Sequence, residues 1–347
     1  MKVSDFDFDL PVHLIAQAPA PARGASKLLV LRKDRSSEHA AVTDLPEILQ
    51  EGDLLVVNDS KVFPARLLGI RVPSGGAVEC LLLSSLDDGH WDALVHPGQK
   101  LKPGSRVVFR GHHHELHGEI LARHFHGRRT IRLWTDDGSA VEDAIDEIGH
   151  IPLPPYIKRD DEPTDRDRYQ TIYARERGSI AAPTAGLHFT PDLLAALDHR
   201  GIERAAITLH VGYGTFQPVR VGQVEDHTVE RERFSIGEAA AATINRAKRE
   251  KRRIIAVGTT TTRALESAAR SGDGVIAAQS VWTDLYIYPG FAFRIVDGLM
   301  TNFHLPQSSL LMLVSAFAGR DTVLAAYREA VERGYRFYSY GDAMLIL

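Results

Sequence analysis

The chain has 347 residues, of which 44% are hydrophobic and 25% are charged. This balance is typical of a folded globular protein and excludes disordered, collagen-like and low-complexity chains. Its 45 acidic and 41 basic side chains give a net charge of −4, so a nucleic-acid partner must meet a local basic patch rather than a broad positive field.

The start of the chain shows no targeting signal. Residues 1–10 alternate acidic and aromatic side chains and lack a basic start followed by an apolar stretch, the pattern of a signal peptide. The richest apolar run, residues 310–318, is about half the length of a membrane span. The single cysteine, Cys80, permits neither an intramolecular disulfide nor a cysteine metal cage. We therefore expect a cytoplasmic protein that does not associate with membranes.

The first half of the chain predicts a buried strand followed by an all-β region. Residues 53–57 form the buried apolar run, and after Gly69 short β-rich runs alternate with turn residues. The strands expected in this region are 77–83, 91–95, 106–109, 119–123 and 130–134. Their spacing predicts a small antiparallel barrel or sandwich.

The all-β region ends at a proline-rich connection. Three prolines in residues 148–157 forbid a helix and indicate a crossover between domains. The mixed acidic and basic residues of 158–168 indicate an exposed loop.

Beyond residue 178, strands and helices alternate. The expected strands are 205–210, 253–257 and 285–288, and the expected helices are 238–251, 261–270, 309–318 and 322–333. This alternation is typical of an α/β layer. The economical arrangement is an α/β domain made of residues 1–65 and 152–347, interrupted by an inserted all-β domain at 66–151. Two sequential domains are the alternative.

A histidine-rich stretch, residues 111–127, raises the question of a metal site. Two zinc-binding histidines on a helix face are spaced four apart, whereas His114 and His117 are three apart in a segment that reads as a β-hairpin. We therefore predict a solvated hairpin tip and no metal.

Two strand-to-loop junctions are candidates for ligand binding. In residues 208–219, Gly212 and Gly214 follow a strand, although a plain turn would look the same. In residues 256–267, four threonines open a helix. One threonine suffices as an N-cap, so the others offer hydroxyls to a ligand at the positive end of the helix. Neither junction has the glycine pattern of a Walker loop or a dinucleotide fold.

Three histidines and one basic cluster leave structural and functional interpretations open. His188 precedes a helix capped by Thr190, and His210 and His304 also lie at strand ends. Each could be a hydrogen-bonded structural residue or a group that transfers protons. The densest positive charge is either a solvated helix face or a set of RNA phosphate contacts, and includes Arg246, Lys248, Arg249, Lys251 and Arg252.

Taken together, the motifs resemble a known family. The matching segments are FDFDLPVHLIAQ, NDSKVFPARLLG, IGHIPLPPYI, YQTIYA, APTAGLHFT, TLHVGYGTFQPV, AVGTTTTRALES, TNFHLPQSSLLMLVSAFAG and YRFYSYGDAMLI. In this order they resemble the S-adenosylmethionine:tRNA ribosyltransferase-isomerases of queuosine biosynthesis. The resemblance runs from Phe6 to Ile346 and is weakest in the β-rich insertion.

The resemblance implies both a fold and a reaction. The implied fold is an α/β domain with a β-barrel-like core and an inserted all-β domain. S-adenosylmethionine would be consumed as a co-substrate, its ribosyl unit passing to 7-aminomethyl-7-deazaguanine at the wobble position of tRNAs with GUN anticodons. The products would be epoxyqueuosine-tRNA, adenine and methionine. No metal or dissociable cofactor is implied, and a monomer is expected.

If the chain has this activity, residues of the matching motifs are candidates for catalysis and for substrate binding. His188 and His210 are candidates for proton transfer, because imidazole titrates near neutral pH. Asp342 and Glu266 are candidate catalytic carboxylates. Arg263, Thr259 and Thr260 would hold the methionine carboxylate. Further candidate substrate-binding residues are Asn58, Arg66, Thr184, Gly186, Gly212, Gly214, Asn302, His304 and Tyr340.

One motif departs from the family. Its usual His-x-Met-His-x-Glu is here His-Thr-Val-Glu-Arg-Glu over residues 227–232, so Glu230 replaces a histidine. Two other functions remain as alternatives. An S-adenosylmethionine-dependent RNA methyltransferase would release S-adenosylhomocysteine, and a noncatalytic tRNA-binding protein would show no turnover.

Overall fold

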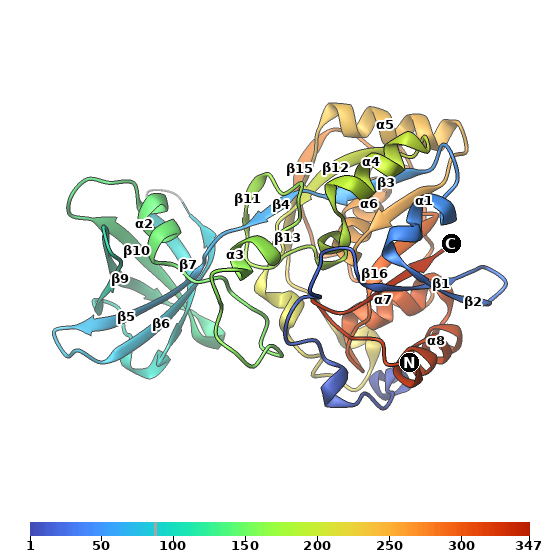
Figure 1. The fold of residues 1–347 in the computed structure, drawn as a ribbon. Coiled ribbons are helices and arrows are strands. Elements are labelled where there is room, and N and C mark those ends of the chain that lie inside the picture. Colours follow the sequence, from blue (N-terminus) through green and yellow to red (C-terminus); the bar gives the residue numbers. More distant parts are fainter. Residues whose placement is uncertain (87–88) are drawn as a thin grey trace.

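The computed structural model describes residues 1–86 and 89–347, which form an α/β layer and a separate closed barrel (Figure 1). Both chain ends lie in the α/β layer, on the opposite side of the molecule from the barrel (Figure 1). The chain leaves the layer after β4 (Ser60–Val62) and returns through β11 (Glu176–Ser179), which pairs with β4 in parallel.

The α/β layer is built on a nine-stranded mixed sheet. Its order is β15-β13-β12-β3-β14-β16-β17-β1-β2. The strand bounds are β1 Lys27–Leu31, β2 Ser37–Ala41, β3 Leu54–Asn58, β12 Glu203–Leu209, β13 Glu232–Ile236, β14 Ile254–Val257, β15 Gln279–Thr283, β16 Gly298–Asn302 and β17 Ala343–Ile346. This sheet has two edge strands, β15 and β2, so the closed barrel of the described residues is the separate one, not the core of the α/β layer.

The central strands are apolar throughout because both faces of the sheet are covered. On β3, Leu54 and Val56 pack toward one group of helices, while Leu55 and Val57 pack toward another. The first group contains α5 (Glu238–Arg249) and α6 (Thr259–Ser271), and the second α1 (Leu45–Ile48) and α4 (Pro191–His199). A third core lies around α7 (Ser309–Ala318) and α8 (Arg320–Glu332).

The barrel is closed by six antiparallel strands in the order β10-β7-β6-β5-β8-β9. Their bounds are β5 Arg66–Val72, β6 Ala77–Ser85, β7 His90–His96, β8 Arg106–Arg110, β9 Glu115–Arg123 and β10 Arg128–Thr135. Alternate apolar residues fill the interior, and α2 (Val141–Ile148) adds Ile145 to the same core. This outcome confirms the prediction of a small antiparallel barrel.

Most elements expected beyond residue 178 are present, with one exception. The expected strand at 285–288 is wrong, because the strand lies earlier, at Gln279–Thr283, where it pairs with β13. Leu285, Tyr286 and Tyr288 instead pack against the core around α7 and α8. Their apolar character reflects this packing rather than a place in a ladder.

No single helix of the described residues is long and apolar enough to cross a bilayer. Together α7 and α8 have the length and apolar composition of a membrane span, but the two helices are bent by 114° at their junction. Residues 311–315 of α7 are buried in the protein core.

Candidate active site

The turn that follows β12 is the point at which four cavities meet. Its residues, 211–215, contribute side chains or backbone to each of them. We call these the barrel cavity (about 730 Å³, around Arg66 and Tyr213), the histidine cavity (about 610 Å³, around His210), the threonine cavity (around Thr260) and the arginine cavity (around Arg263). Sequence reasoning singled out this turn, and the geometry makes it the centre of the candidate site.

Glu232, at the start of β13, holds the turn in place. One carboxylate oxygen, Oε1, accepts hydrogen bonds from Gly212 N at 2.9 Å and from Thr215 Oγ1 at 3.3 Å. The other oxygen, Oε2, pairs with the Arg263 guanidinium, and both of these side chains are buried. Nε of Arg263 donates to Leu285 O at 2.9 Å, but its Nη2 is buried without a partner. The arginine cavity therefore contains an unused cationic donor.

The start of α6 offers unpartnered polar groups to the threonine cavity. The first backbone bond of the helix runs from Thr262 N to Gly258 O, which leaves the preceding N–H groups without helical partners. Thr261 Oγ1 and Thr262 Oγ1 donate back to carbonyl oxygens of the preceding turn. In contrast, Thr260 Oγ1 is buried and has no partner. Thus two of the four hydroxyls serve the helix, and Thr260 is available to a ligand.

The threonine cavity also contains Asn302 and His304. Oδ1 of Asn302 is buried without a partner, while its Nδ2 lies 3.3 Å from His188 Nε2 and donates to Tyr338 O at 3.1 Å. His304 Nε2 lies 2.9 Å from Thr301 Oγ1, and burial lowers the pKa of His304 to about 3. His304 is therefore neutral at physiological pH.

Burial, reinforced by the charges of Arg336 and Arg23, lowers the pKa of His188 to about 4 from 6.5. The unfolded chain takes up this proton below about pH 6.5, whereas the folded protein does so only near pH 4, so acid favours unfolding.

We expect His188 to destabilise the fold by about 3 kcal/mol as the pH falls from about 6.5 to about 4. Urea unfolding at several pH values should show a shallower pH dependence for His188→Gln than for the wild type. His13→Gln, at an exposed position, is the control; equal slopes in both variants would contradict this role of His188.

His210 faces the histidine cavity from the end of β12. Its Nδ1 is buried without a hydrogen-bond partner, and burial lowers its pKa, so the neutral imidazole can accept a proton. Gly178 passes close to the ring with φ of +144°, and a Cβ at this position would lie 2.9 Å from the imidazole. A side chain at residue 178 would therefore push His210 out of place.

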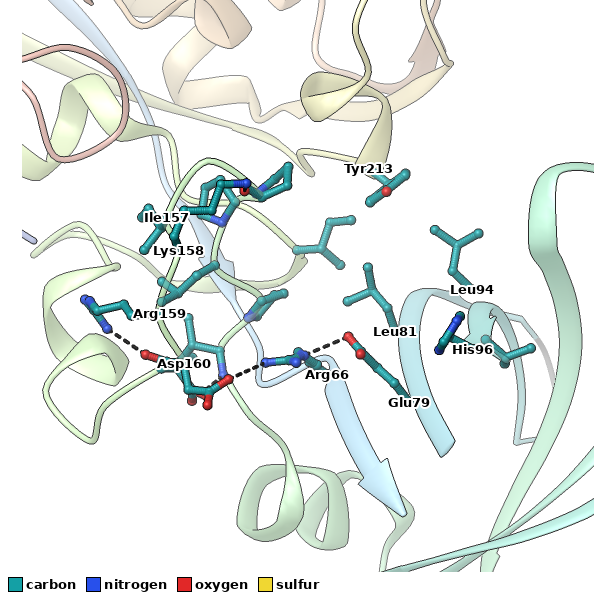
Figure 2. Close-up of a pocket in the computed structure, with 18 of the residues that line it drawn as sticks. Arg66, Glu79, Leu81, Leu94, His96, Ile157, Lys158, Arg159, Asp160 and Tyr213 are labelled. Carbon is teal, nitrogen blue, oxygen red and sulfur yellow. Dashed lines mark hydrogen bonds and ion pairs between the residues drawn. The ribbon is translucent and has the colours of Figure 1, made fainter. Parts of the chain in front are cut away.

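The barrel cavity lies where the barrel meets the α/β layer (Figure 2). Figure 2 shows Arg66 between two carboxylates, with its Nε 2.8 Å from Glu79 and its Nη1 3.7 Å from Asp160. Leu81 and Leu94 supply the apolar wall on the barrel side. This mixture of apolar surface and convergent charge is typical of a binding pocket.

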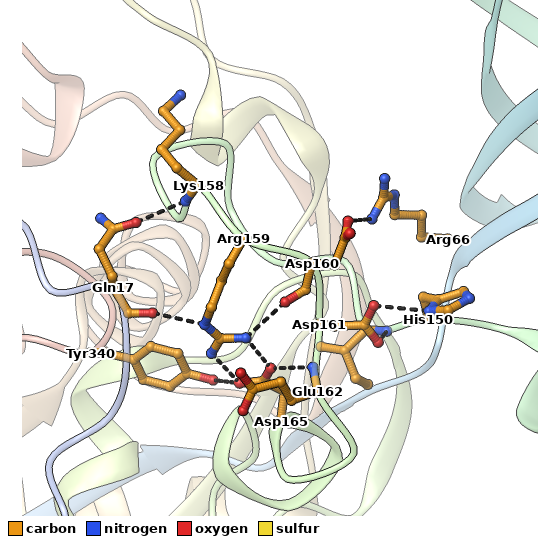
Figure 3. A network of polar contacts seen from close by, with 11 residues as sticks. Gln17, Arg66, His150, Lys158, Arg159, Asp160, Asp161, Glu162, Asp165 and Tyr340 are labelled. Carbon is orange, nitrogen blue, oxygen red and sulfur yellow. Dashed lines mark hydrogen bonds and ion pairs between the residues drawn. The ribbon is translucent and has the colours of Figure 1, made fainter.

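The segment after the prolines is organised by an ion pair between the partly buried Arg159 and the buried Asp165 (Figure 3). Arg159 makes two hydrogen bonds to the buried Asp165, at 2.6 and 2.9 Å, and Tyr340 Oη donates to the same carboxylate at 2.8 Å. Arg159 Nε also donates to Gln17 O at 3.1 Å, which ties the segment to the N-terminal region. Many residues of 158–168 are exposed as expected, but this network gives the segment a fixed conformation rather than that of a simple loop.

The predicted substrate-binding residues are distributed over several cavities. The threonine cavity receives Thr184, Thr259, Thr260, Asn302 and His304; the arginine cavity Gly214 and Arg263; the histidine cavity His210 and Gly212; and the barrel cavity Arg66. A further small cavity of about 30 Å³ contains His188 and Tyr340. His188 and His210 thus line different cavities.

Four predicted site residues do not line these cavities. Glu266 accepts three backbone N–H bonds, from residues 294, 295 and 296. Asp342 accepts from Lys27 N and Arg336 N. Asn58 joins β3 to Leu209 of β12, and Gly186 is buried in the turn Thr184–His188. The two carboxylates therefore hold backbone segments in place, and the geometry does not support a catalytic role for Glu266 or Asp342.

The predicted RNA-binding cluster lies at the other end of the sheet. Residues 246–252 precede the start of β14, whereas the threonine cavity lies at the carboxyl end of the same strand. Arg246 and Arg252 both pair with Glu203, and Lys248 donates to Arg294 O. Arg249 and Lys251 are exposed. The prediction that these five residues contact RNA bound at the candidate site is therefore not supported by their placement.

The histidine-rich stretch forms the expected hairpin. Gly111 N donates to His114 O across its tip, and His117 lies on β9 beside Asp136. The side chain of His126 lies outside the described residues. Among the residues that are described, no group of three His, Cys, Asp or Glu side chains could hold a metal ion.

Three residues of this site were not predicted from the sequence. Glu230, known only as a departure from the family motif, joins the layer to the barrel through Arg128, at 2.7 Å. Glu232 was not selected, although the buried Arg263 requires a counterion, and that requirement could have pointed to it. Trp282 lines the histidine cavity from β15, which was not predicted as a strand.

Comparison with known proteins identifies relatives over the full length of the chain. Residues 3–346 match a family model described as queuosine biosynthesis protein. A protein named S-adenosylmethionine:tRNA ribosyltransferase-isomerase from Desulfitobacterium hafniense is 51% identical over 348 residues, and one of the same name from Heliobacterium modesticaldum is 52% identical over 350; each alignment covers 100% of both chains. A solved structure, S-adenosylmethionine tRNA ribosyltransferase from Thermotoga maritima, has 38% identity and a TM-score of 0.55, covering 99% of this chain and 100% of that one.

Proposed function

This chain belongs to the queuosine biosynthesis family, and from that premise we propose that the cavities joined by residues 211–215 form the active site of an S-adenosylmethionine:tRNA ribosyltransferase-isomerase. The assignment of this activity rests on one observation, which is that the whole chain matches proteins of that name at about 50% identity. The enzyme transfers and isomerises the ribosyl moiety of S-adenosylmethionine onto tRNA.

We propose that the acceptor base and the tRNA are those that the resemblance to the family implies. The acceptor is 7-aminomethyl-7-deazaguanine at the wobble position of a GUN anticodon, and an anticodon stem-loop should suffice for recognition. Purified protein, S-adenosylmethionine and such a stem-loop should release adenine, together with a matching cyclopentane-epoxide gain in RNA mass. Release of S-adenosylhomocysteine would favour the methyltransferase alternative, and tight binding without turnover would favour the noncatalytic one.

We assign the methionine end of S-adenosylmethionine to the threonine and arginine cavities. A carboxylate at the start of α6 would accept hydrogen bonds from free backbone N–H groups and from Thr260 Oγ1. Asn302 Oδ1, which has no partner, can accept from the ammonium group. The unpartnered Nη2 of Arg263 is a second donor on the other side of Thr215. The assignment is supported by the coincidence of three unsatisfied polar atoms in adjoining cavities.

We propose His210 as the group that takes the proton from the carbon next to the sulfonium. The sulfonium acidifies this carbon, so its deprotonation can open the ribose and expel adenine; attack by the aminomethyl nitrogen, epoxide closure and loss of methionine follow. A base must be neutral before it acts, and burial keeps the pKa of His210 below its usual value. His188 lies 3.3 Å from Asn302 and is better described as a positioning residue.

The RNA is expected to approach at the barrel side of the layer, where the barrel and histidine cavities open. Lys158 is exposed on the rim of the barrel cavity, and its Nζ donates to Pro155 O. We expect Lys158→Glu to weaken stem-loop binding severalfold and to lower its salt dependence by about one phosphate contact. Lys248→Glu and Arg249→Glu, at the other end of the sheet, should change the affinity by less than about twofold. Filter binding at several salt concentrations tests this contrast, and the reverse order of effects would contradict it.

The remaining expectations concern the working form of the enzyme. We propose a monomer, because one chain supplies the residues named at all four cavities, and a cytoplasmic location, because the substrate is tRNA. Sedimentation at assay concentrations tests the first. We further propose that S-adenosylmethionine is a consumed co-substrate with no additional cofactor, so that dialysis against a chelator should leave adenine release unchanged.

We also propose the domain division 1–65 with 152–347, and 66–151 as the inserted domain. It is supported by the six barrel strands, which fall between residues 66 and 135, and by the paired backbone bonds between Arg66 and His150 where the chain enters and leaves.

A further inference from the structure

Three side chains form a row across neighbouring strands at one edge of the sheet. Trp282 of β15 lies directly opposite Arg233 of β13, and His210, which follows β12, donates its N–H to Arg233 O at 3.0 Å. Residues opposite one another on antiparallel strands project from the same face. All three line the histidine cavity, which also opens onto the glycine turn after β12.

The outer end of this row is exposed and aromatic. Trp282 is 54% exposed on an edge strand, which is unusual for so large an apolar side chain. The inner end is His210, whose Nδ1 is buried without a partner. The row thus extends from the exposed indole of Trp282 to the buried Nδ1 of His210, which has no hydrogen-bond partner and can bind a ligand.

The charges along the cavity differ between its wall and its rim. In the wall, Arg128 is neutralised by Glu230 and Asp92. At the rim, Arg231 and Arg233 are exposed, and neither makes an ion pair within residues 1–86 and 89–347; the guanidinium of Arg233 donates to the Ser280 hydroxyl at 3.3 Å. The rim therefore presents two unneutralised guanidinium groups next to an exposed indole.

We propose that Trp282 is a stacking platform for an unpaired nucleobase of the RNA substrate, next to the base that is modified, and that Arg233 contacts the phosphate between the two. Single-stranded RNA is held by bases stacked on aromatic side chains and by phosphates on arginines, and an indole beside a free guanidinium supplies both. The proposal rests on the proposed function, because the modified base would occupy the histidine cavity beyond Arg233.

Fluorescence titration with an unmodified anticodon stem-loop tests the stacking directly. The chain has three tryptophans, of which Trp91 is buried in the barrel and Trp134 lies on β10. A stacked base should quench the emission of Trp282, so the wild type and Trp134→Phe should show saturable quenching that Trp282→Phe lacks. Quenching that persists in Trp282→Phe would overturn the proposal.

Kinetics provide a second, independent readout. Loss of one stacked base costs about 1–3 kcal/mol, so Trp282→Ala should raise the KM for the stem-loop by about 5- to 150-fold. Trp282→Phe keeps an aromatic face and should recover most of this loss, while the KM for S-adenosylmethionine should stay the same in both. An unchanged stem-loop KM in an active Trp282→Ala enzyme would overturn the stacking alone. Absence of adenine release from the wild type would instead overturn the proposed function, and the titration would still decide the stacking.

Discussion

Replacement of Glu232 by alanine is expected to lower the free energy of unfolding by about 3–5 kcal/mol and to abolish adenine release. The carboxylate is 3% exposed and is the counterion of the buried Arg263. Without it, the guanidinium keeps its charge in a site from which water is largely excluded. The same change removes the acceptor for Gly212 N and Thr215 Oγ1, so the turn at the centre of the four cavities loses its anchor.

Urea unfolding and an adenine-release assay measure the two effects of this change. Glu232→Gln keeps an acceptor oxygen for the turn but not the negative charge, so its loss of stability should be intermediate. Glu332→Ala, on the exposed surface of α8, is the matched control and should fall within about 0.5 kcal/mol of the wild type. A Glu232→Ala protein as stable as this control would show that Arg263 does not depend on Glu232.

Replacement of Thr260 by valine is expected to raise the KM for S-adenosylmethionine about 10- to 150-fold without loss of stability. Hydrogen bonds to charged groups contribute about 1.5–3 kcal/mol, which corresponds to this range. In the free protein the Thr260 hydroxyl is buried and has no partner, so a methyl group of similar size removes an unsatisfied polar atom. Stability should therefore stay equal or rise slightly.

Thr262→Val is the matched control two residues along the same helix. The Thr262 hydroxyl donates to Gly258 O, so this variant should lose about 1 kcal/mol of stability while its KM for S-adenosylmethionine changes little. Opposite effects of two identical substitutions would separate a ligand-binding threonine from a structural one. An unchanged KM in Thr260→Val would remove Thr260 from the substrate site.

The local elements and the chemistry of the turn after β12 could be predicted from the amino-acid sequence. Alternating and continuous apolar runs show how many faces of a segment are buried, so β3, the barrel strands and α7 could be predicted from short windows. The cap at Thr190 could be predicted for the same reason, because its hydroxyl accepts from Leu193 N only three residues away. The activity was implied by long ordered motifs rather than by any of these patterns.

Which of the candidate residues lie together depends on contacts between segments that are far apart in the chain. Arg263 and Glu232 are 31 residues apart, and the row of Trp282, Arg233 and His210 comes from three separate segments. The charge of the basic residues 246–252 predicted RNA contacts. The direction of β14, however, places these residues at the end of the sheet opposite the threonine cavity. Local periodicity reports which side of an element is buried, but strand order and direction are fixed by long-range pairing. For that reason partners distant in sequence, and the end of the sheet at which they lie, could not be predicted from any local pattern.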